Sequence, residues 1–108
     1  MMDEIFCDVE KAVHYEETRI KQEHGERYHT IHETYGVMME EICEARKETN
    51  SLDDFEKAMM SAMHRNDTAT LDLIYDRIAG CAIRAACELI QVAAVCRKAL
   101  GGVEVHEK

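Results

Sequence analysis

The chain of 108 residues contains no proline, only five glycines, and few aromatic side chains, namely four tyrosines and two phenylalanines. Proline breaks helices, so its absence beside many Ala, Glu, Met and Lys residues favours an all-helical fold. The composition is 46% hydrophobic and 32% charged, which is typical of a globular chain and not of a disordered one. We therefore predict a single all-α domain over residues 1–108, with residues 103–108 as a loose tail.

The five cysteines include no CxxC pair, and their odd number and scattered spacing argue against a disulfide scaffold or a zinc knuckle. We expect them to be small buried hydrophobes in a reduced protein, at Cys7, Cys43, Cys81, Cys87 and Cys96. The N-terminus also lacks the basic start and apolar stretch of a signal peptide. These features predict a cytoplasmic protein.

Acidic residues outnumber basic ones, 22 Asp and Glu against 13 Lys and Arg, and the formal net charge is -9. Binding to a nucleic-acid backbone needs a basic surface, so no nucleic-acid partner is expected. An anionic substrate remains possible where metal ions carry the contact. The chain contains no Gly-rich phosphate loop, no nucleophile with a base and no zinc-ligand spacing.

Apolar residues at helical spacing predict four helices, at residues 3–24, about 31–49, about 52–64 and about 69–100. We expect Gly25 to end the first helix and Asn50-Ser51 to separate the second from the third. Asp67 or Thr68 is expected to cap the last helix, which should stop at Gly101-Gly102. Four helices with short connections favour an antiparallel bundle.

Between Ile78 and Cys96 the only strongly polar side chains are Arg84, Glu88 and Gln91, which share one narrow stripe of a helix. A helix that is apolar nearly all round is expected to be buried. Its length approaches that of a membrane span, but its polar residues make insertion costly, so we predict a core helix and no membrane partner. Burial of Glu88 then requires compensation, either by an ion pair with Arg84 or by a metal ion.

The acidic run at residues 40–44 is the best candidate to face this stripe. Glu41, Glu44 and Glu48 should border the apolar side of their helix, whereas Glu33 and Glu40 should point to solvent. Mg²⁺ prefers oxygen ligands from a few carboxylates and binds substrate phosphates at the same time. A magnesium site from Glu41, Glu44, Glu88 and the amide oxygen of Gln91 is one interpretation, and a solvated acidic face beside a structural Arg84–Glu88–Gln91 network is the other.

Two segments resemble the MazG-like all-alpha nucleoside triphosphate pyrophosphohydrolases, particularly small phage and prophage members. The first is His32-Glu33-Thr34-Tyr35-Gly36-Val37-Met38-Met39-Glu40-Glu41-Ile42-Cys43-Glu44, and the second is Glu88-Leu89-Ile90-Gln91-Val92-Ala93-Ala94. The match covers roughly residues 28–49 and 82–97. The resemblance implies a helical bundle in which Glu-x-x-Glu and Glu-x-x-Asp, on two packed helices, bind Mg²⁺, with Mn²⁺ as a possible substitute.

In such a site the metal holds the triphosphate while water releases pyrophosphate and a nucleoside monophosphate. Carried over by position, the ligands are Glu41, Glu44 and Glu88, and Glu41 or Glu44 orients the attacking water. This chain has Gln91 where the common pattern has Asp, and an amide brings no charge, so affinity for a second metal ion should be lower. Some phage-type relatives resemble this chain in carrying Gln at that position.

His32, Lys47 and Arg84 are further candidates for substrate contact, although ordinary surface roles explain them as well. Tyr35 is expected in the core. Apolar residues exceed what a small monomer can cover, and sites in the family are often completed by neighbouring subunits, so we expect a homodimer or homotetramer. The alternative function is a non-catalytic helical oligomer, or a nucleotide-binding relative with a degenerate metal site.

Overall fold

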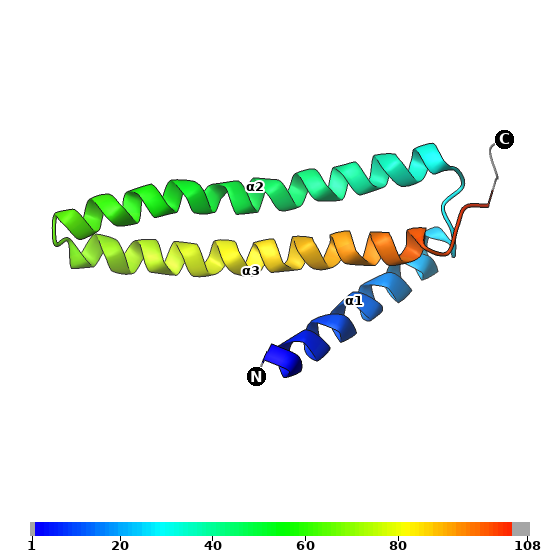
Figure 1. Ribbon diagram of the computed structural model, residues 1–108, viewed down its shortest axis with the longest axis horizontal. Coiled ribbons are helices and arrows are strands. Elements are labelled where there is room, and N and C mark those ends of the chain that lie inside the picture. The colour runs from blue at the N-terminus through cyan, green and yellow to red at the C-terminus, as the bar shows by residue number, and fades with distance from the viewer. Residues whose placement is uncertain (1, 105–108) are drawn as a thin grey trace.

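A computed structural model describes residues 2–104, and in this range the chain forms three helices. They are α1 (Met2–His24), α2 (Ile31–His64) and α3 (Thr68–Ala99). Figure 1 shows α2 and α3 side by side as a long antiparallel hairpin, with α1 joining them at one end and then diverging. The all-helical prediction is confirmed, but the helices number three and not four.

The predicted break at Asn50-Ser51 does not occur, because these residues lie inside one helix of 34 residues. Ser51 Oγ donates to the carbonyl of Lys47 at 3.1 Å, and Thr49 Oγ1 donates to the carbonyl of Arg46 at 3.2 Å. The hydroxyls therefore bond within the helix instead of capping a new one. With no proline or glycine in this stretch, packing against α3 outweighs the weak helix propensity of Asn and Ser.

The two turns are closed by capping residues. Thr30 Oγ1 accepts a hydrogen bond from the Glu33 amide and caps α2, and Asp67 accepts from the Thr70 amide and caps α3, as predicted. Gly25 follows α1 with a φ of 95°, a conformation that costs glycine least. Asn66 adopts a φ of 53° in the turn between α2 and α3.

Val103 and Glu104, the first two residues of the predicted tail, contact the turn between α1 and α2. Val103 forms an isolated bridge with Tyr28, and the Glu104 amide donates to the Tyr28 carbonyl at 2.9 Å. The chain after α3 is thereby tied to the turn between α1 and α2. The rest of the predicted tail, residues 105–108, lies outside the described residues.

The helix α3 packs against both other helices, while α1 and α2 share no packed interface among the described residues. Small side chains dominate the buried positions between helices, and these allow the helix axes to approach closely: Ala45, Ala62, Cys81, Ala85 and Ala94. The core is therefore narrow. The molecule measures 61 × 30 × 21 Å, and its radius of gyration is 18.4 Å, against about 13 Å for a compact domain of this length.

Several side chains expected inside are exposed. Tyr35 is 68% exposed, so its predicted place in the core is wrong, and Cys7, Cys43 and Cys87 are exposed as well. The apolar helix α3 keeps a large open face, although we expected it to be buried. By length and composition it is also long enough to cross a membrane, and only 22% of its most apolar stretch is buried inside the chain.

Candidate functional site

The polar stripe of α3 faces α2 at its start and α1 at its end. Arg84 Nε donates to Glu48 Oε2 of α2 at 3.3 Å. Cys81, one turn earlier, donates through Sγ to the Glu48 carbonyl at 3.0 Å, and burial, then the charge of Glu48, raises the pKa of its thiol. Glu48 thus borders the interface, as the sequence predicted. Arg84 is bonded to Glu48, so the Arg84–Glu88 ion pair, one of the two compensations considered for Glu88, is not formed.

Glu41 of α2 and Glu88 of α3 face each other further along the hairpin. Both are half-buried, and neither forms a hydrogen bond or an ion pair with any residue of the 2–104 range. Burial raises the pKa of the Glu41 carboxyl above 4.5, and the charges of Glu88, Glu40 and Glu44 raise it further. Two like charges therefore meet at an interface with nothing that neutralises them, which is unfavourable for the protein alone.

The third predicted ligand points elsewhere. Glu44 is exposed, and its Oε1 accepts a hydrogen bond from Lys47 Nζ at 2.9 Å. The side chains of both residues are largely open to solvent, so this pair is a weak surface contact. Glu44 thus lies one turn from Glu41 on the same helix, outside the interface that Glu41 shares with Glu88.

The fourth predicted ligand, Gln91, docks α1. Its Nε2 donates to Glu16 Oε2 at 2.6 Å, and the same carboxylate accepts from Arg19 NH2 at 2.8 Å. Arg19 also contacts Glu23 at 2.9 Å, so three residues of α1 form one network at its junction with α3. The hydrogen bond from Arg19 is the main reason that the pKa of Glu16 is lowered. The side-chain oxygen of Gln91 makes no hydrogen bond to the described residues.

A cavity of about 310 Å³ opens where the three helices meet. We call it the junction cavity. Residues from α1, from the turn and from both helices of the hairpin line it, namely Arg19, Ile20, His24, Tyr28, Glu33, Val37, Glu41, Gln91, Val95 and Lys98. It thus includes Glu41 and Gln91 of the predicted site. Glu33, expected to face solvent on the far side, also lines it and contacts His29 Nδ1 at 2.9 Å.

Lys98 and Tyr28 are the buried polar residues of this cavity. Lys98 is 1% exposed and Tyr28 is 4% exposed, and Lys98 Nζ lies 4.2 Å from the centroid of the Tyr28 ring. The Tyr28 hydroxyl is buried and has no hydrogen-bond partner among the described residues. The sequence analysis missed both residues. For Lys98 a signal existed, because it lies seven residues after Gln91 and so extends the polar stripe of α3 by two turns.

None of the three predicted substrate residues lines the junction cavity as the described residues form it. Arg84 is held at Glu48, Lys47 is held at Glu44, and His32 is exposed in the first turn of α2. The cationic side chains that do line it are Arg19, His24 and Lys98. They come from the second half of α1 and from the end of α3, and all three lie outside both motif segments.

Mg²⁺ needs few protein ligands, because it keeps several waters and shares its remaining positions with substrate phosphates. Within residues 2–104 no group of three or more His, Cys, Asp or Glu side chains is gathered closely enough to hold a metal ion. Glu41 and Glu88 supply two facing carboxylates, and the free oxygen of Gln91 lies on the same stripe as Glu88. A hard cation held by these groups would have to take the rest of its coordination from phosphate and water.

Comparison with protein-family models, with curated proteins and with solved structures found no match to this chain.

Proposed function

We propose that the chain is a Mg²⁺-dependent nucleoside triphosphate pyrophosphohydrolase of MazG-like type. The reaction joins water to a nucleoside triphosphate and breaks the bond between the α-phosphate and the β-phosphate. The products are a nucleoside monophosphate and pyrophosphate. The proposed location is the cytoplasm, where such substrates are found, and Mn²⁺ is expected to replace Mg²⁺.

The observation that supports this proposal most is the pair Glu41 and Glu88. Two half-buried carboxylates face each other, and the nearby arginine on α3 is bonded to a different acid. A protein gains nothing in stability from such a pair, so a bound cation is the natural compensation. The two residues also fall at matching positions of the two motif segments, which are far apart in sequence and face each other across the hairpin.

The residues have separate tasks in this proposal. Glu41 and Glu88 hold the metal ion, with the Gln91 oxygen as a neutral ligand and Glu44 as an additional carboxylate one turn away. When bound, the metal supplies a Lewis acid and a template for the phosphates. Glu41 also orients the attacking water, and Glu44 is the other candidate for that task. A raised pKa suits Glu41 to accept a proton better than an ordinary surface carboxylate does.

The test is pyrophosphate release from a panel of canonical and modified nucleoside triphosphates with Mg²⁺ or Mn²⁺. Glu41→Gln should abolish metal-dependent release. Glu40→Gln is the matched control, because Glu40 is the exposed neighbour on the same helix and should leave turnover unchanged. Absence of release from every triphosphate by the folded wild-type protein would sink the enzyme proposal.

One alternative has specific support. Gln91 is bonded to Glu16 and Glu44 is bonded to Lys47, so two of the four candidate ligands already serve structural contacts. A non-catalytic helical oligomer, or a nucleotide-binding relative with a degenerate metal site, fits these contacts. Nucleotide binding without pyrophosphate release would favour this alternative.

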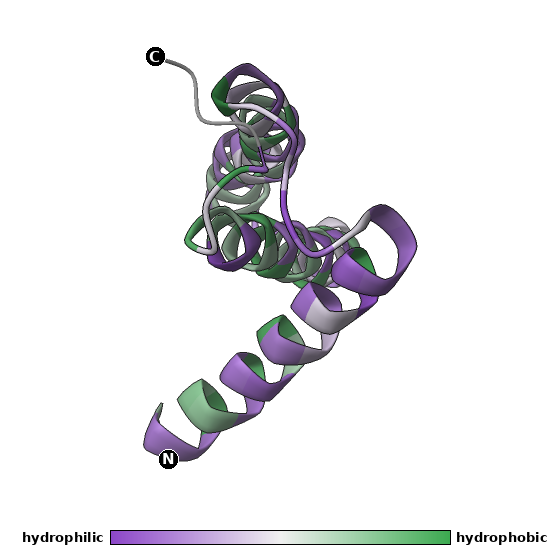
Figure 2. Cartoon of the chain, turned by 90° about the vertical axis from the view of Figure 1, so that its right-hand side faces the viewer, coloured by the Kyte–Doolittle hydropathy of each residue, from purple (hydrophilic) through white to green (hydrophobic). Residues whose placement is uncertain are grey.

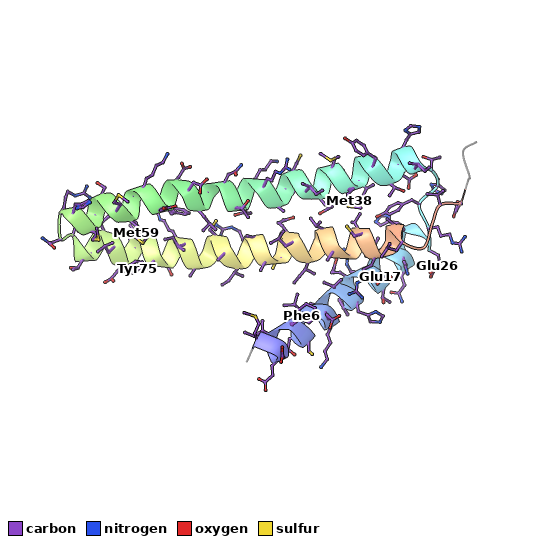
Figure 3. The ribbon with its side chains drawn as sticks, viewed as in Figure 1. Phe6, Glu17, Glu26, Met38, Met59 and Tyr75 are labelled. Carbon is purple, nitrogen blue, oxygen red and sulfur yellow. The ribbon has the colours of Figure 1, made fainter. Side chains whose placement is uncertain are left out.

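We further propose that the chain forms a homodimer or homotetramer through the open wedge between α1 and α3. In Figure 1 the N-terminal half of α1 separates from α3, and Figure 2 shows it projecting away from the other two helices. Val13 is buried against α3, and apolar residues continue its face toward the N-terminus, at Ile5, Phe6 and Val9. Figure 3 shows Phe6 on the separated part. This face therefore lacks a covering surface within the chain.

The opposite side of the wedge is equally apolar. Ile83 is 65% exposed and Leu89 is 51% exposed. A hollow of about 240 Å³ also lies between α3 and α1, and it is lined by Val9, Val13, Ala86, Leu89, Ile90 and Ala93. The chain exposes 7927 Å², against about 6,100 Å² for a monomeric protein of its mass. The excess is larger than the roughly 800 Å² that each subunit loses in a standard dimer interface. A second copy is thus the occupant that we propose for the wedge.

A further inference from the structure

We propose that Lys98 and Tyr28 form a phosphate-binding subsite in the wall of the junction cavity, beside the Glu41–Glu88 pair. The identity of the ligand as a metal-bound polyphosphate rests on the proposed function. The existence of the subsite rests on the two buried side chains themselves. It accounts for two groups that neither motif segment explains.

Lys98 carries a charge that the protein does not neutralise by contact. It is 1% exposed, yet it forms no ion pair with any carboxylate of residues 2–104. The ring of Tyr28, 4.2 Å from Nζ, offsets part of the cost of burying an ammonium group. Lysines are almost never this deeply buried without a charged partner. An anionic oxygen in the cavity would provide that partner.

Tyr28 offers a second donor at the same place. Its hydroxyl is buried without a hydrogen-bond partner among the described residues, which is rare for a buried phenol. Burial, then the charges of Glu33 and Glu41, raises its pKa, so the hydroxyl keeps its proton at neutral pH. Lys98 and Tyr28 both line a cavity that Glu41 also lines. This combination suits an acceptor-rich ligand such as phosphate.

The other charged side chains that line the cavity indicate which kind of phosphate ligand it would bind. Arg19 is already neutralised by Glu16 and Glu23, with three contacts of 2.9 Å or less. Glu33 and Glu41 also line the cavity, and their negative charges act on Tyr28, so a bare polyanion would be repelled. A divalent cation bound by Glu41 and Glu88 would remove this repulsion. Lys98 would then bind the phosphate group farthest from the cation. We therefore infer a metal-bound polyphosphate and not free phosphate.

The experiment is calorimetric titration of the full chain with inorganic tripolyphosphate, with Mg²⁺ and without it. Lys98→Met keeps the apolar stem and removes the charge. It should weaken binding at least about tenfold, as the loss of one hydrogen bond to a charged group does. Arg97→Met is the matched control, because Arg97 is the exposed neighbour that contacts Glu10 outside the cavity. Lys98→Arg should restore part of the affinity.

Equal affinity of Lys98→Met and wild type would overturn the subsite, and so would no binding of tripolyphosphate to wild type with Mg²⁺. Thermal unfolding of each variant, measured alongside, separates a lost contact from a lost fold. Tyr28→Phe removes only the hydroxyl and provides a second, milder variant that should weaken binding in the same direction. If the wild-type protein hydrolyses triphosphates but Lys98→Met binds tripolyphosphate as well as wild type does, the enzyme proposal would stand without the subsite. If Lys98→Met weakens tripolyphosphate binding but no triphosphate is hydrolysed, the subsite would stand without the enzyme proposal.

Discussion

Arg84 donates to Glu48 across the α2–α3 interface, 3.3 Å from Nε to Oε2, although Glu88 lies only one turn away on its own helix. The partner that Arg84 bonds determines which acidic residue of the hairpin is neutralised by an arginine. An arginine bonded to Glu88 would have neutralised the one acidic residue in the most apolar part of α3. Because Arg84 bonds to Glu48 of α2, Glu88 has no arginine partner where it faces Glu41.

The first prediction concerns the stability of the metal-free protein. Burial and neighbouring acids raise the pKa of Glu41, so the folded state binds a proton more tightly than the unfolded state does. Stability is therefore lost as the pH rises from 4.5 through the raised pKa, and the loss persists at neutral pH. Glu41→Gln should increase the free energy of unfolding at pH 7 by up to about 1 kcal/mol, measured by thermal unfolding in a chelator.

Glu40→Gln provides the comparison, since the exposed neighbour should change the same free energy by less than about 0.5 kcal/mol. The advantage of Glu41→Gln should also disappear as the pH falls below 4.5, because Glu41 is then protonated in both the folded and the unfolded state. A lower melting temperature for Glu41→Gln at pH 7 would show that the carboxylate already has a stabilising contact.

The second prediction concerns metal. Mg²⁺ or Mn²⁺ at a hundred times its dissociation constant should stabilise the wild-type protein by about 2.7 kcal/mol, because the ion binds only the folded state. Glu41→Gln and Glu88→Gln should each remove this gain, and Glu44→Gln should reduce it less, since Glu44 faces Lys47. Differential scanning fluorimetry over a metal series measures the effect. An equal metal response in all four proteins would argue against a site at the hairpin.

The third prediction concerns Gln91, the position at which the MazG-like motif that we propose for this chain would have Asp. Here the amide donates to Glu16 at 2.6 Å and holds α1 against α3. Gln91→Asp would place a carboxylate against Glu16, so it should destabilise the fold by about 1–3 kcal/mol, the cost of an unsatisfied buried group. Adding Glu16→Gln restores a donor and should recover much of that loss, which a double-mutant cycle of chemical unfolding measures.

The single variant Gln91→Asp and the double variant with Glu16→Gln also distinguish an effect on stability from an effect on metal binding. The double variant carries the family's acidic residue with a compatible neighbour, so its metal affinity should exceed that of the wild type. If the single variant proves as stable as the wild type, the hydrogen bond to Glu16 has no structural weight and the choice of Gln needs another reason.

Much of the fold follows from the sequence, because apolar periodicity and missing prolines specify helices locally. The ends of α1 and α3, and the Asp67 cap, fall within a residue or two of their predicted places. The continuity of α2 through Asn50 and Ser51 did not follow, since hydroxyl groups that often cap a helix bond internally here. Propensity is weak enough that contact with α3 decides the outcome.

The candidate site was predictable only in part. Periodicity identifies the face on which Glu41 and Glu48 lie, because a helix repeats its geometry. It does not fix which rotamer Arg84 or Glu44 adopts, and those choices depend on partners from other elements. Lys98 lies near Tyr28 because the end of α3, with Val103 after it, packs against the turn between α1 and α2. A single sequence gives little indication of that contact.

The fourth prediction tests the wedge. Phe6→Glu or Ile83→Glu would place a charge on an apolar surface that a second copy covers, and a two-fold interface contains each substitution twice. An unpaired buried carboxylate costs several kcal/mol, so the dimer dissociation constant should rise by at least about a hundredfold. Tyr15→Glu is the control, since this residue is 71% exposed and lies on the opposite side of α1 from Val13.

Analytical ultracentrifugation over a concentration series measures the change, and flotation with phospholipid vesicles runs beside it. The proposal expects a wild-type dimer or tetramer that does not float, and monomers for Phe6→Glu and Ile83→Glu. A wild-type monomer at every concentration would remove the second copy from the wedge. Co-flotation with vesicles that Ile83→Glu abolishes would instead assign the open face of α3 to lipid, because that helix is long enough to span a bilayer.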